Sequence, residues 1–431
     1  MIVRSAEPLA GGLAATVDRA MVARRVTLVL AAVAAIGQVS TTIYLPSIPE
    51  LSRSLGIAES TVQLTIVAYL IPFALFQLIA GPIADSRGRR VTLAGGMALF
   101  MAGSLLGAFS WHPAILFLGR FLQGVGASAG YTVSRAVARD LFEGPQLTRV
   151  IGDIALAFAL APGMMPAVGG FANDFLGWRA NFGIPAGFGL AILAGVLGFL
   201  PETLASSVPF DPRRLAGAYA PIAGSARFIG FALLSTVPFI GLFAFFASGP
   251  AYTINVVGLT PREFGVLPPL AVCGFLVGLT LSRRMLRGPR AGMTVRLGIG
   301  VGLLSAALIF SFYHLGLLGA AQLTACMFIH ATGMGIVIPV TSAEAIRPFG
   351  ASAGAASALL GFTQMSGAIA GTLATSQLGV ALGRYAFPEV MLAGAVLGCV
   401  VLGLSGRAVR TAGETAVRAV RPAVGPTDVP A

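Results

Sequence analysis

Residues 81–119 read GPIADSRGRRVTLAGGMALFMAGSLLGAFSWHPAILFLG. A charged segment at the start of this stretch ends at Arg90, and the 29 residues that follow contain no Asp, Glu, Lys or Arg. A helix needs about 20 apolar residues to cross the hydrocarbon core of a bilayer. The stretch therefore predicts a membrane-spanning helix that begins directly after a charged loop.

The composition of the whole chain extends that prediction. Of 431 residues, 56% are hydrophobic and 10% are charged, against roughly 45–50% and 25% in soluble domains. Backbone polar groups must be paired inside lipid, and the apolar runs are too long for barrel strands, so we expect an all-α membrane protein. Twelve runs are predicted to span the membrane, near residues 26–48, 60–84, 91–110, 114–135, 148–171, 180–200, 227–248, 264–282, 292–312, 316–341, 352–380 and 388–406.

The distribution of basic residues predicts the orientation of the chain. All 28 are arginine, and the formal net charge is +12. Most lie in the gaps on one side of the alternating apolar runs, which is the positive-inside pattern of an oriented membrane protein. A nucleic-acid-binding protein would instead gather them in a basic groove. We therefore expect a multi-pass protein of the lipid bilayer with both termini in the cytoplasm and no nucleic-acid partner.

The longest hydrophilic gap divides the apolar runs into two sets of six. A weak internal echo supports a duplication, because Gly278 and Ser282 repeat the spacing of Gly81 and Asp85. The predicted organisation is a cytoplasmic segment at 1–25, a six-helix half at 26–200, a cytoplasmic linker at 201–226, a six-helix half at 227–406 and a disordered cytoplasmic tail at 407–431.

Motifs of enzymes and metal sites are missing from the sequence. Cys273, Cys326 and Cys399 lie inside apolar runs without CxxC spacing or a nearby ligand cluster. The sequence contains no HExxH and no paired intramembrane carboxylates. We expect no metal, no cofactor and no enzymatic activity.

The charged segment GPIADSRGRR resembles the GxxxDRxGRR loop shared across the major facilitator superfamily. A carboxylate at a helix end, followed by arginines across a glycine turn, forms ion pairs that latch helices and release as two halves move. Ser86 stands where the family usually has a basic residue. The gate-loop residues are Gly81, Asp85, Gly88, Arg89 and Arg90.

A buried arginine is predicted in the fourth run. The sequence GRFLQGVGAS resembles the RxxQG motif of the superfamily, with Arg120, Gln123 and Gly124 in place. A guanidinium inside a membrane is costly unless it is paired or faces water. Arg120 and Gln123 lie one helical turn apart, so we expect both on one face, directed toward a central cavity. An arginine that reaches the outer interface is the alternative.

The fifth run contains PGMMPAVGG, which resembles the proline and glycine motif of antiporters in the same superfamily. Met165 stands where that motif usually has glycine. Proline kinks a helix, and missing side chains permit close helix packing that seals a cavity. The motif favours export, while a pure packing role remains the alternative. Its residues are Pro162, Pro166, Gly169 and Gly170.

Further segments are similar to the bicyclomycin and chloramphenicol resistance group of twelve-span drug:proton antiporters. They are TTIYLPSIPEL at 41–51, RAVARDLF at 135–142, PET at 201–203 and PFGASAGAASALLGFTQMSGA at 348–368. This resemblance covers residues 40–371. It implies a major facilitator fold of about twelve helices in two six-helix halves, and proton-driven export of small amphipathic drugs by a monomer in the bacterial cytoplasmic membrane.

The usual proton site of that group is absent. Its members carry an acidic residue just before the YLP of the first run, where this chain has Thr42. A buried carboxylate is a natural proton carrier because burial raises its pKa toward neutrality. The remaining coupling candidates are Asp153, which is also placed to pair with Arg149, and His330, midway along the tenth run.

Polar and aromatic residues on apolar helices are candidates for lining the substrate cavity. Any one of them could instead hold two helices together. The candidates are Thr42, Tyr44, Gln63, Tyr69, Gln77, Tyr131, Phe243, Phe246 and Gln364. Two other functions remain open at this stage, a transporter of a metabolite or sugar with the same fold and a membrane receptor that does not transport.

Overall fold

The computed structural model describes residues 12–285 and 291–405, and within these ranges the chain is helical and contains no strand. This confirms the all-α prediction. The predicted tail at 407–431 lies outside the described residues. Helix α1 begins at Gly12, inside the predicted segment 1–25.

Twelve long helices coincide with the twelve predicted runs. The first six are α1 (Gly12–Thr42), α3 (Glu59–Arg87), α4 (Arg89–Ala108), α5 (Pro113–Leu141), α6 (Gly144–Leu176) and α7 (Ala180–Phe199). The second six are α9 (Ala226–Asn255), α10 (Pro261–Met285), α11 (Ala291–His314), α12 (Ala320–Ile346), α13 (Ala353–Leu382) and α14 (Phe387–Leu404). Four short helices connect them, namely η1 (Leu45–Ser47), α2 (Ile48–Leu55), α8 (Pro212–Ala223) and η2 (Arg347–Ser352).

Ten of the long helices qualify as membrane spans on length and apolar composition alone, while α5 and α13 do not. Both of these helices turn polar side chains inward. Arg120 and Gln123 of α5 are completely buried, and Thr372 of α13 is buried as well. Because these groups are shielded from lipid, the two helices belong to the same bundle as the other ten.

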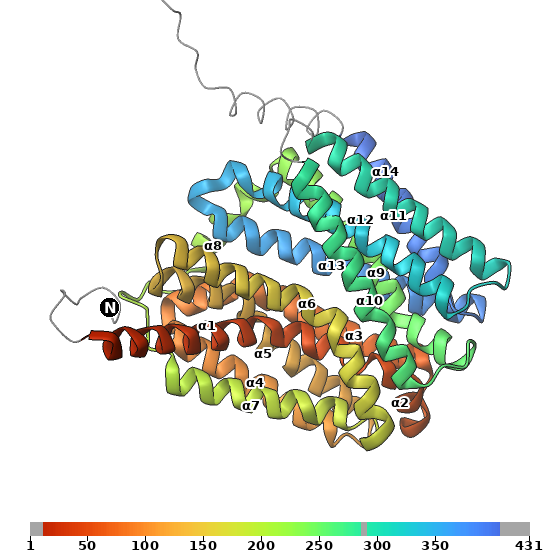
Figure 1. The fold of residues 1–431 in the computed structure, drawn as a ribbon, viewed down its shortest axis with the longest axis horizontal. Coiled ribbons are helices and arrows are strands. Elements are labelled where there is room, and N and C mark those ends of the chain that lie inside the picture. Colours follow the sequence, from red (N-terminus) through yellow and green to blue (C-terminus); the bar gives the residue numbers. More distant parts are fainter. Residues whose placement is uncertain (1–11, 286–290, 406–431) are drawn as a thin grey trace, which may run out of the picture.

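The helices form two groups of six (Figure 1). In the first group α5 packs against α1, α3 and α4, and in the second α9 packs against α12, α13 and α14. The groups are joined mainly by α6 against α10 and by α3 against α13. This confirms the fold class of two six-helix halves, while the exact boundaries at 200 and 227 stay predictions.

The two ends of the bundle are named here by their contents. The loop end holds the loop between α3 and α4 together with α8, and the far end holds η1 and α2. In Figure 1 the two groups lie apart on the left, at the loop end, and close together on the right, at the far end. The linker between the two groups of helices contains the short helix α8. The Asp211 side chain caps the start of α8 by accepting the backbone N–H of Arg213 at 2.8 Å.

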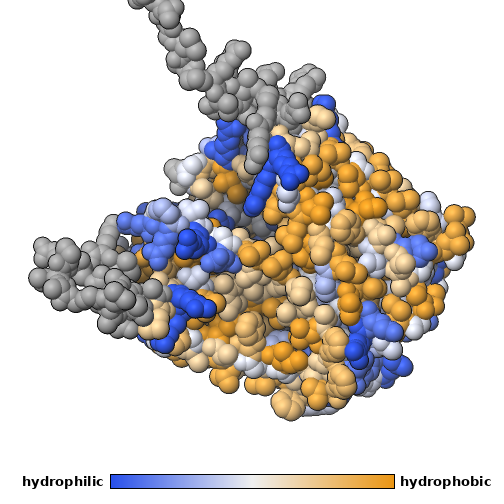
Figure 2. All heavy atoms as spheres, in the orientation of Figure 1, coloured by the Kyte–Doolittle hydropathy of each residue, from blue (hydrophilic) through white to orange (hydrophobic). Residues whose placement is uncertain are grey.

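Apolar residues cover the outside of the bundle between its two ends. Figure 2 shows a broad hydrophobic surface over the middle of this face, with hydrophilic residues gathered toward the left and the lower right. Leu28, Phe175 and Leu404 expose more than half of their side chains. A soluble monomer rarely exposes an apolar patch of this extent. The surface is that of a multi-pass membrane protein.

Glycines allow the helices to approach backbone to backbone. A Cβ atom on Gly124 would overlap the carbonyl oxygen of Tyr69, and one on Gly169 would overlap that of Ile43. Helices in lipid gain no hydrophobic driving force from associating, so close backbone contact supplies much of their attraction. The spacing of α1, α3, α5 and α6 therefore depends on these positions.

We predict that Gly169→Ala lowers the melting temperature of the protein. The added methyl group forces α6 away from α1, and overpacking of this kind costs about 1–3 kcal/mol. The matched control is Gly152→Ala in the same helix, where a Cβ meets nothing within 4 Å and the gain in helix propensity is up to about 1 kcal/mol. Equal melting temperatures of the two variants in thermal unfolding would contradict this account of the packing.

Candidate functional site

A cavity of about 580 Å³ lies between the two halves. The first half contributes Phe73 and Gln77 from α3, and the second contributes Phe243 from α9 and Gln364 from α13. Its walls are predominantly apolar and aromatic with a few polar groups, as in sites that bind drug-sized amphipathic molecules. Movement of one half against the other would change the shape of such a site.

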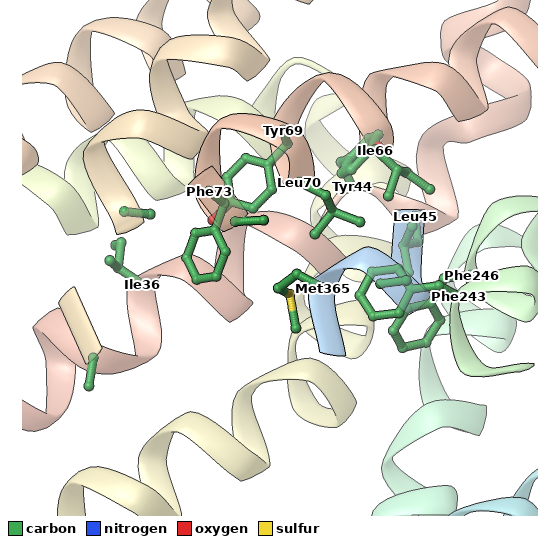
Figure 3. Close-up of a cluster of buried hydrophobic side chains, with 14 of the residues drawn as sticks. Ile36, Tyr44, Leu45, Ile66, Tyr69, Leu70, Phe73, Phe243, Phe246 and Met365 are labelled. Carbon is green, nitrogen blue, oxygen red and sulfur yellow. The ribbon is translucent and has the colours of Figure 1, made fainter. Parts of the chain in front are cut away.

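Five predicted lining residues lie on the cavity wall, namely Gln77, Tyr131, Phe243, Phe246 and Gln364. Pro162 of the antiporter-type motif lies there as well. Gln364 Nε2 also donates to Ser235 Oγ of α9 at 2.7 Å, so this amide links two helices besides facing the cavity. Figure 3 shows Phe243 and Phe246 together on one side of the buried cluster, with Met365 between them and the Tyr69–Phe73 pair of α3.

The other four predicted residues, Thr42, Tyr44, Gln63 and Tyr69, do not line the cavity. Each is buried. The Thr42 hydroxyl donates to the Gln38 carbonyl of its own helix at 3.1 Å, and the Tyr69 hydroxyl donates to the Gly37 carbonyl at 2.7 Å. Thr42, Tyr44 and Tyr69 form their hydrogen bonds inside the helix bundle. Periodicity along a single helix does not reveal such contacts.

The cavity is closed at the far end by contacts between the halves. Asn255 Nδ2 donates to Glu59 Oε1 at 2.6 Å and to the Tyr385 hydroxyl at 3.2 Å. Ser376 Oγ donates to the Ser60 carbonyl at 3.0 Å. These bonds join α3 to α9 and α13. The contacts that close the far end are therefore polar, and they lie farther toward that end than the apolar residues that line the cavity.

Close packing of α6 against α10 completes the far-end closure. A Cβ on Gly170 would overlap the Pro261 carbonyl oxygen, and one on Gly265 would lie 2.5 Å from the Pro166 carbonyl oxygen. Two residues of the antiporter-type motif, Pro166 and Gly170, thus contact the second half directly. At the other end the cavity wall continues to Arg139, Ile346 and Gly354. The cavity accordingly opens toward the loop end.

Arg120 does not face this cavity, contrary to the orientation expected from the sequence. Its side chain is fully buried in the first half, where its Cζ lies 4.5 Å from the ring centroids of both Tyr44 and Tyr69. Its Nη1 donates to the Ser40 carbonyl at 2.9 Å and to Gln123 Oε1 at 2.9 Å. Within the described ranges no carboxylate lies within 4 Å of it. Aromatic faces and carbonyl oxygens therefore stabilise this charge without a counter-ion.

The gate loop is organised around a carboxylate that sequence reasoning did not assign to it. Glu202 follows α7, yet its two oxygens accept the backbone N–H groups of Arg89 at 2.8 Å and Arg90 at 3.2 Å. Gly88 has a φ of +104°, and a Cβ there would collide with Glu202 Oε2. Burial raises the pKa of Glu202, but the backbone N–H donors of Leu204, Arg89, Thr203 and Arg90 outweigh this and hold it below its usual value.

Ion pairs extend the gate loop to α5. Arg89 reaches Asp85 at 3.5 Å and Asp140 at 2.8 Å, and Asp140 also accepts the Thr203 hydroxyl at 2.7 Å. Arg90 donates to the Leu197 carbonyl. Gly81 is less constrained, since a Cβ there would make only an ordinary contact of 3.9 Å with Thr132. The loop between α3 and α4 is thus fastened to α5 and to the segment after α7.

The two coupling candidates have different surroundings. Asp153 is exposed, lies away from the cavity wall and has no ion pair with Arg149 within 4 Å in the described part of the chain. His330 of α12 is buried, its Nε2 lies 3.2 Å from the Pro238 carbonyl of α9, and its Nδ1 has no hydrogen-bond partner in the described structure. Among the described residues there is no cluster of three His, Cys, Asp or Glu side chains that could hold a metal.

Two halves of six helices around a cavity that opens at one end are the arrangement of an alternating-access transporter. The sequence matches the family described as Major Facilitator Superfamily over residues 30–372. The chain belongs to this superfamily, which is a family of transporters.

Several curated relatives cover most of the chain. It is 31% identical to the uncharacterised MFS-type transporter YdgK of Bacillus subtilis (strain 168), over 77% of this chain and 83% of that protein. It is 29% identical to multidrug resistance protein D of Escherichia coli (strain K12), over 79% and 85%. It is 28% identical to a chloramphenicol resistance protein of Pseudomonas aeruginosa, over 84% and 85%. These relatives confirm the resemblance to the drug-resistance group.

Solved structures support the fold. A peptide transporter POT, solved in complex with sulfate, superimposes with a TM-score of 0.71 at 17% identity and covers 90% of this chain and 95% of its own. At this level of identity the likeness concerns the arrangement of helices alone.

We predict that Glu202→Gln exposes the backbone N–H groups of Arg89 and Arg90 to solvent exchange. The pKa of Glu202 is lowered in the folded protein. Its contribution is therefore fully present above the ordinary carboxyl pKa and is lost as the pH falls through the lowered value. Hydrogen exchange of the full chain in nanodiscs, corrected for the intrinsic rate, measures the effect.

The control is Glu263→Gln, which alters a similar cap at the far end, where Glu263 Oε2 accepts the Thr260 N–H at 2.8 Å. It is expected to leave exchange at Arg89 and Arg90 unchanged. Equal protection of these two groups in wild type and Glu202→Gln would refute the assigned role of Glu202.

Proposed function

We propose that the chain exports small amphipathic compounds, such as antibiotics of the chloramphenicol or bicyclomycin type, from the cytoplasm in exchange for protons. The observation that carries this proposal is the apolar, aromatic cavity shared by both halves and open at one end only. The names of the relatives, a multidrug resistance protein and a chloramphenicol resistance protein, point to the same class of cargo.

Alternating access follows from the contacts at the two ends. In the proposed orientation the loop end and both termini are cytoplasmic, so the described conformation receives substrate from inside the cell. For release, the contacts of Glu59 with Asn255 and of Ser60 with Ser376 must break, and the halves must close at the loop end. We propose that a monomer in the cytoplasmic membrane performs this cycle with the proton gradient as its energy source and without a cofactor.

We propose His330 as the proton carrier in place of the missing acid at Thr42. Its neighbours on α12, Met327, Ala331 and Met334, line the cavity. Its ring contacts α9 at Pro238, inside a helix that contributes four phenylalanines to the wall. Protonation of a buried imidazole would leave a charge with one hydrogen-bond acceptor, which favours a rearrangement that brings water to it. Asp153 does not line the cavity and forms no hydrogen bond or ion pair with a second helix in the described part of the chain.

In inverted membrane vesicles we expect substrate to induce proton release. The release is measured as the recovery of fluorescence from a quenched pH-sensitive dye. Chloramphenicol and a panel of neutral and cationic drugs serve as substrates. In the His330→Ala variant this release is predicted to fall to the level of vesicles without the protein, because no group remains to exchange the proton. Asp153→Asn is predicted to retain it.

The matched control is His314→Ala. His314 lies at the far end, 3.1 Å from Glu389, and does not line the cavity. If no compound releases protons from wild-type vesicles, drug:proton antiport is wrong, and a metabolite or sugar transporter or a receptor becomes the better description. If His330→Ala transports as well as His314→Ala, the proton is carried elsewhere.

A further inference from the structure

The charged side chains on the described cavity wall are all positive. No Asp or Glu is among the described residues that line it, whereas Arg135 and Arg139 are. Both arginines count toward the positive-inside pattern of the sequence, where such residues normally serve orientation alone. Here they lie on the wall of the cavity at its open end, in reach of any molecule that enters.

Helix geometry places the two arginines on one face of α5. Tyr131, Arg135 and Arg139 follow each other at intervals of four residues, which is one helical turn. The Arg135 Cζ lies 5.4 Å from the centroid of the Tyr131 ring, and that ring lies 4.4 Å from the ring of Phe158 on α6. A pair of aromatic rings therefore leads from the arginines into the interior of the cavity.

Neither arginine has a counter-ion. In the described part of the chain no carboxylate lies within 4 Å of Arg135 or Arg139. The adjacent Asp140 is already held by Arg89 and by Thr203. The Nε of Arg135 is buried and has no hydrogen-bond partner among the described residues. Arg139 is repelled by the charges of Arg135 and Arg89 and attracted by that of Asp140, which is shared with Arg89. Positive charge therefore exceeds negative charge at this point.

The rest of the wall fits the apolar body of a ligand. The side chains beyond the arginines are mainly aromatic and aliphatic, with glutamine amides as hydrogen-bonding groups; they include Phe73, Phe158, Phe239, Phe275, Met334 and Gln77. A planar apolar group would pack among them, while an acidic group would stay at the open end. Guanidinium groups bind carboxylates and phosphates with two parallel hydrogen bonds, which a neutral group does not match.

We propose that the cavity prefers amphipathic aromatic compounds that carry one negative charge, with Arg135 and Arg139 as the residues that bind the anionic group. Neutral compounds of the same shape bind more weakly, and cationic ones bind most weakly because no carboxylate faces them. This inference rests on the proposed export function and defines its substrate class. Specificity here arises as much from rejection of cations as from attraction of anions.

A series of three probes of one shape tests the preference. They are 2-naphthoate, 2-naphthamide and 2-naphthylmethylammonium, whose binding to the full chain in nanodiscs is followed by naphthalene fluorescence. Wild type is expected to bind naphthoate about tenfold or more tightly than naphthamide, the scale of a hydrogen bond to a charged group. The ammonium compound is expected to bind most weakly.

Substitutions locate the effect. The double variant Arg135→Gln with Arg139→Gln is expected to bind naphthoate no better than naphthamide, and the corresponding double lysine variant is expected to restore most of the preference. The matched control is Arg149→Gln, an exposed arginine at the loop end of α6 that does not line the cavity. It removes a positive charge from the same end of the protein and is expected to leave the preference intact.

The proposal is wrong if naphthylmethylammonium binds as tightly as naphthoate, if the double glutamine variant retains the preference with an unchanged melting temperature, or if Arg149→Gln abolishes it equally. It is also wrong if none of the three probes binds. If naphthamide binds and is transported, and the three probes bind equally well whatever their charge, only the anion site is wrong and the export function stands. When binding occurs without transport of any probe in proteoliposomes, the export function itself fails.

Discussion

The far-end contact between the two halves is the interaction on which the described conformation depends. Helices α3 and α13 meet there through Ser60 and Ser376, and α6 meets α10 through a glycine on each side. The same helix pairs form the main connection between the halves. A cavity between two bodies held together mainly at one end opens at the other. The access of the cavity to the loop end is therefore a consequence of where the halves touch.

The interior of the first half is fixed by a charge without a counter-ion. Arg120 is held by two tyrosine rings and by backbone and amide oxygens, and Gln123 continues the network to Ser104 at 2.8 Å. Removal of a buried charge's partners is costly because the charge would then be left unsatisfied. This network ties α1, α3, α4 and α5 together. The second half provides the phenylalanine-rich part of the cavity wall.

Much of the fold could be predicted from the sequence. Apolar runs of helical length gave all twelve long helices, because backbone pairing in lipid leaves no other regular structure. The gate loop was predicted from its resemblance to the GxxxDRxGRR motif, and Gly88 in it occupies a backbone conformation that favours glycine. The contact of Glu202 with this loop was not, because it joins residues more than a hundred positions apart and no local pattern marks it.

The cavity was predicted in part, for a related reason. Polar and aromatic residues on apolar helices are either lining residues or links between helices, and only the packing decides which. Tyr69 and Gln77 lie on the same helix, yet the first donates to the backbone of α1 and the second faces the cavity. Arg135 and Arg139 were assigned to orientation because charge counting carries no information on which side of a helix faces an opening. Arg120 was placed in the cavity because a guanidinium inside a membrane must be paired or face water, whereas tyrosine rings and carbonyl groups supply the stabilisation.

Distances between spin labels at the two ends test the central claim, that the halves exchange contacts at one end for contacts at the other. One pair would join Ala58 to Ala381 across the far end, and a second would join Thr148 to Arg284 across the loop end, in a background without the three native cysteines. Substrate with a proton gradient is predicted to lengthen the first distance and shorten the second. Transport with both distances unchanged, or changed in the same sense, would contradict alternating access around this cavity.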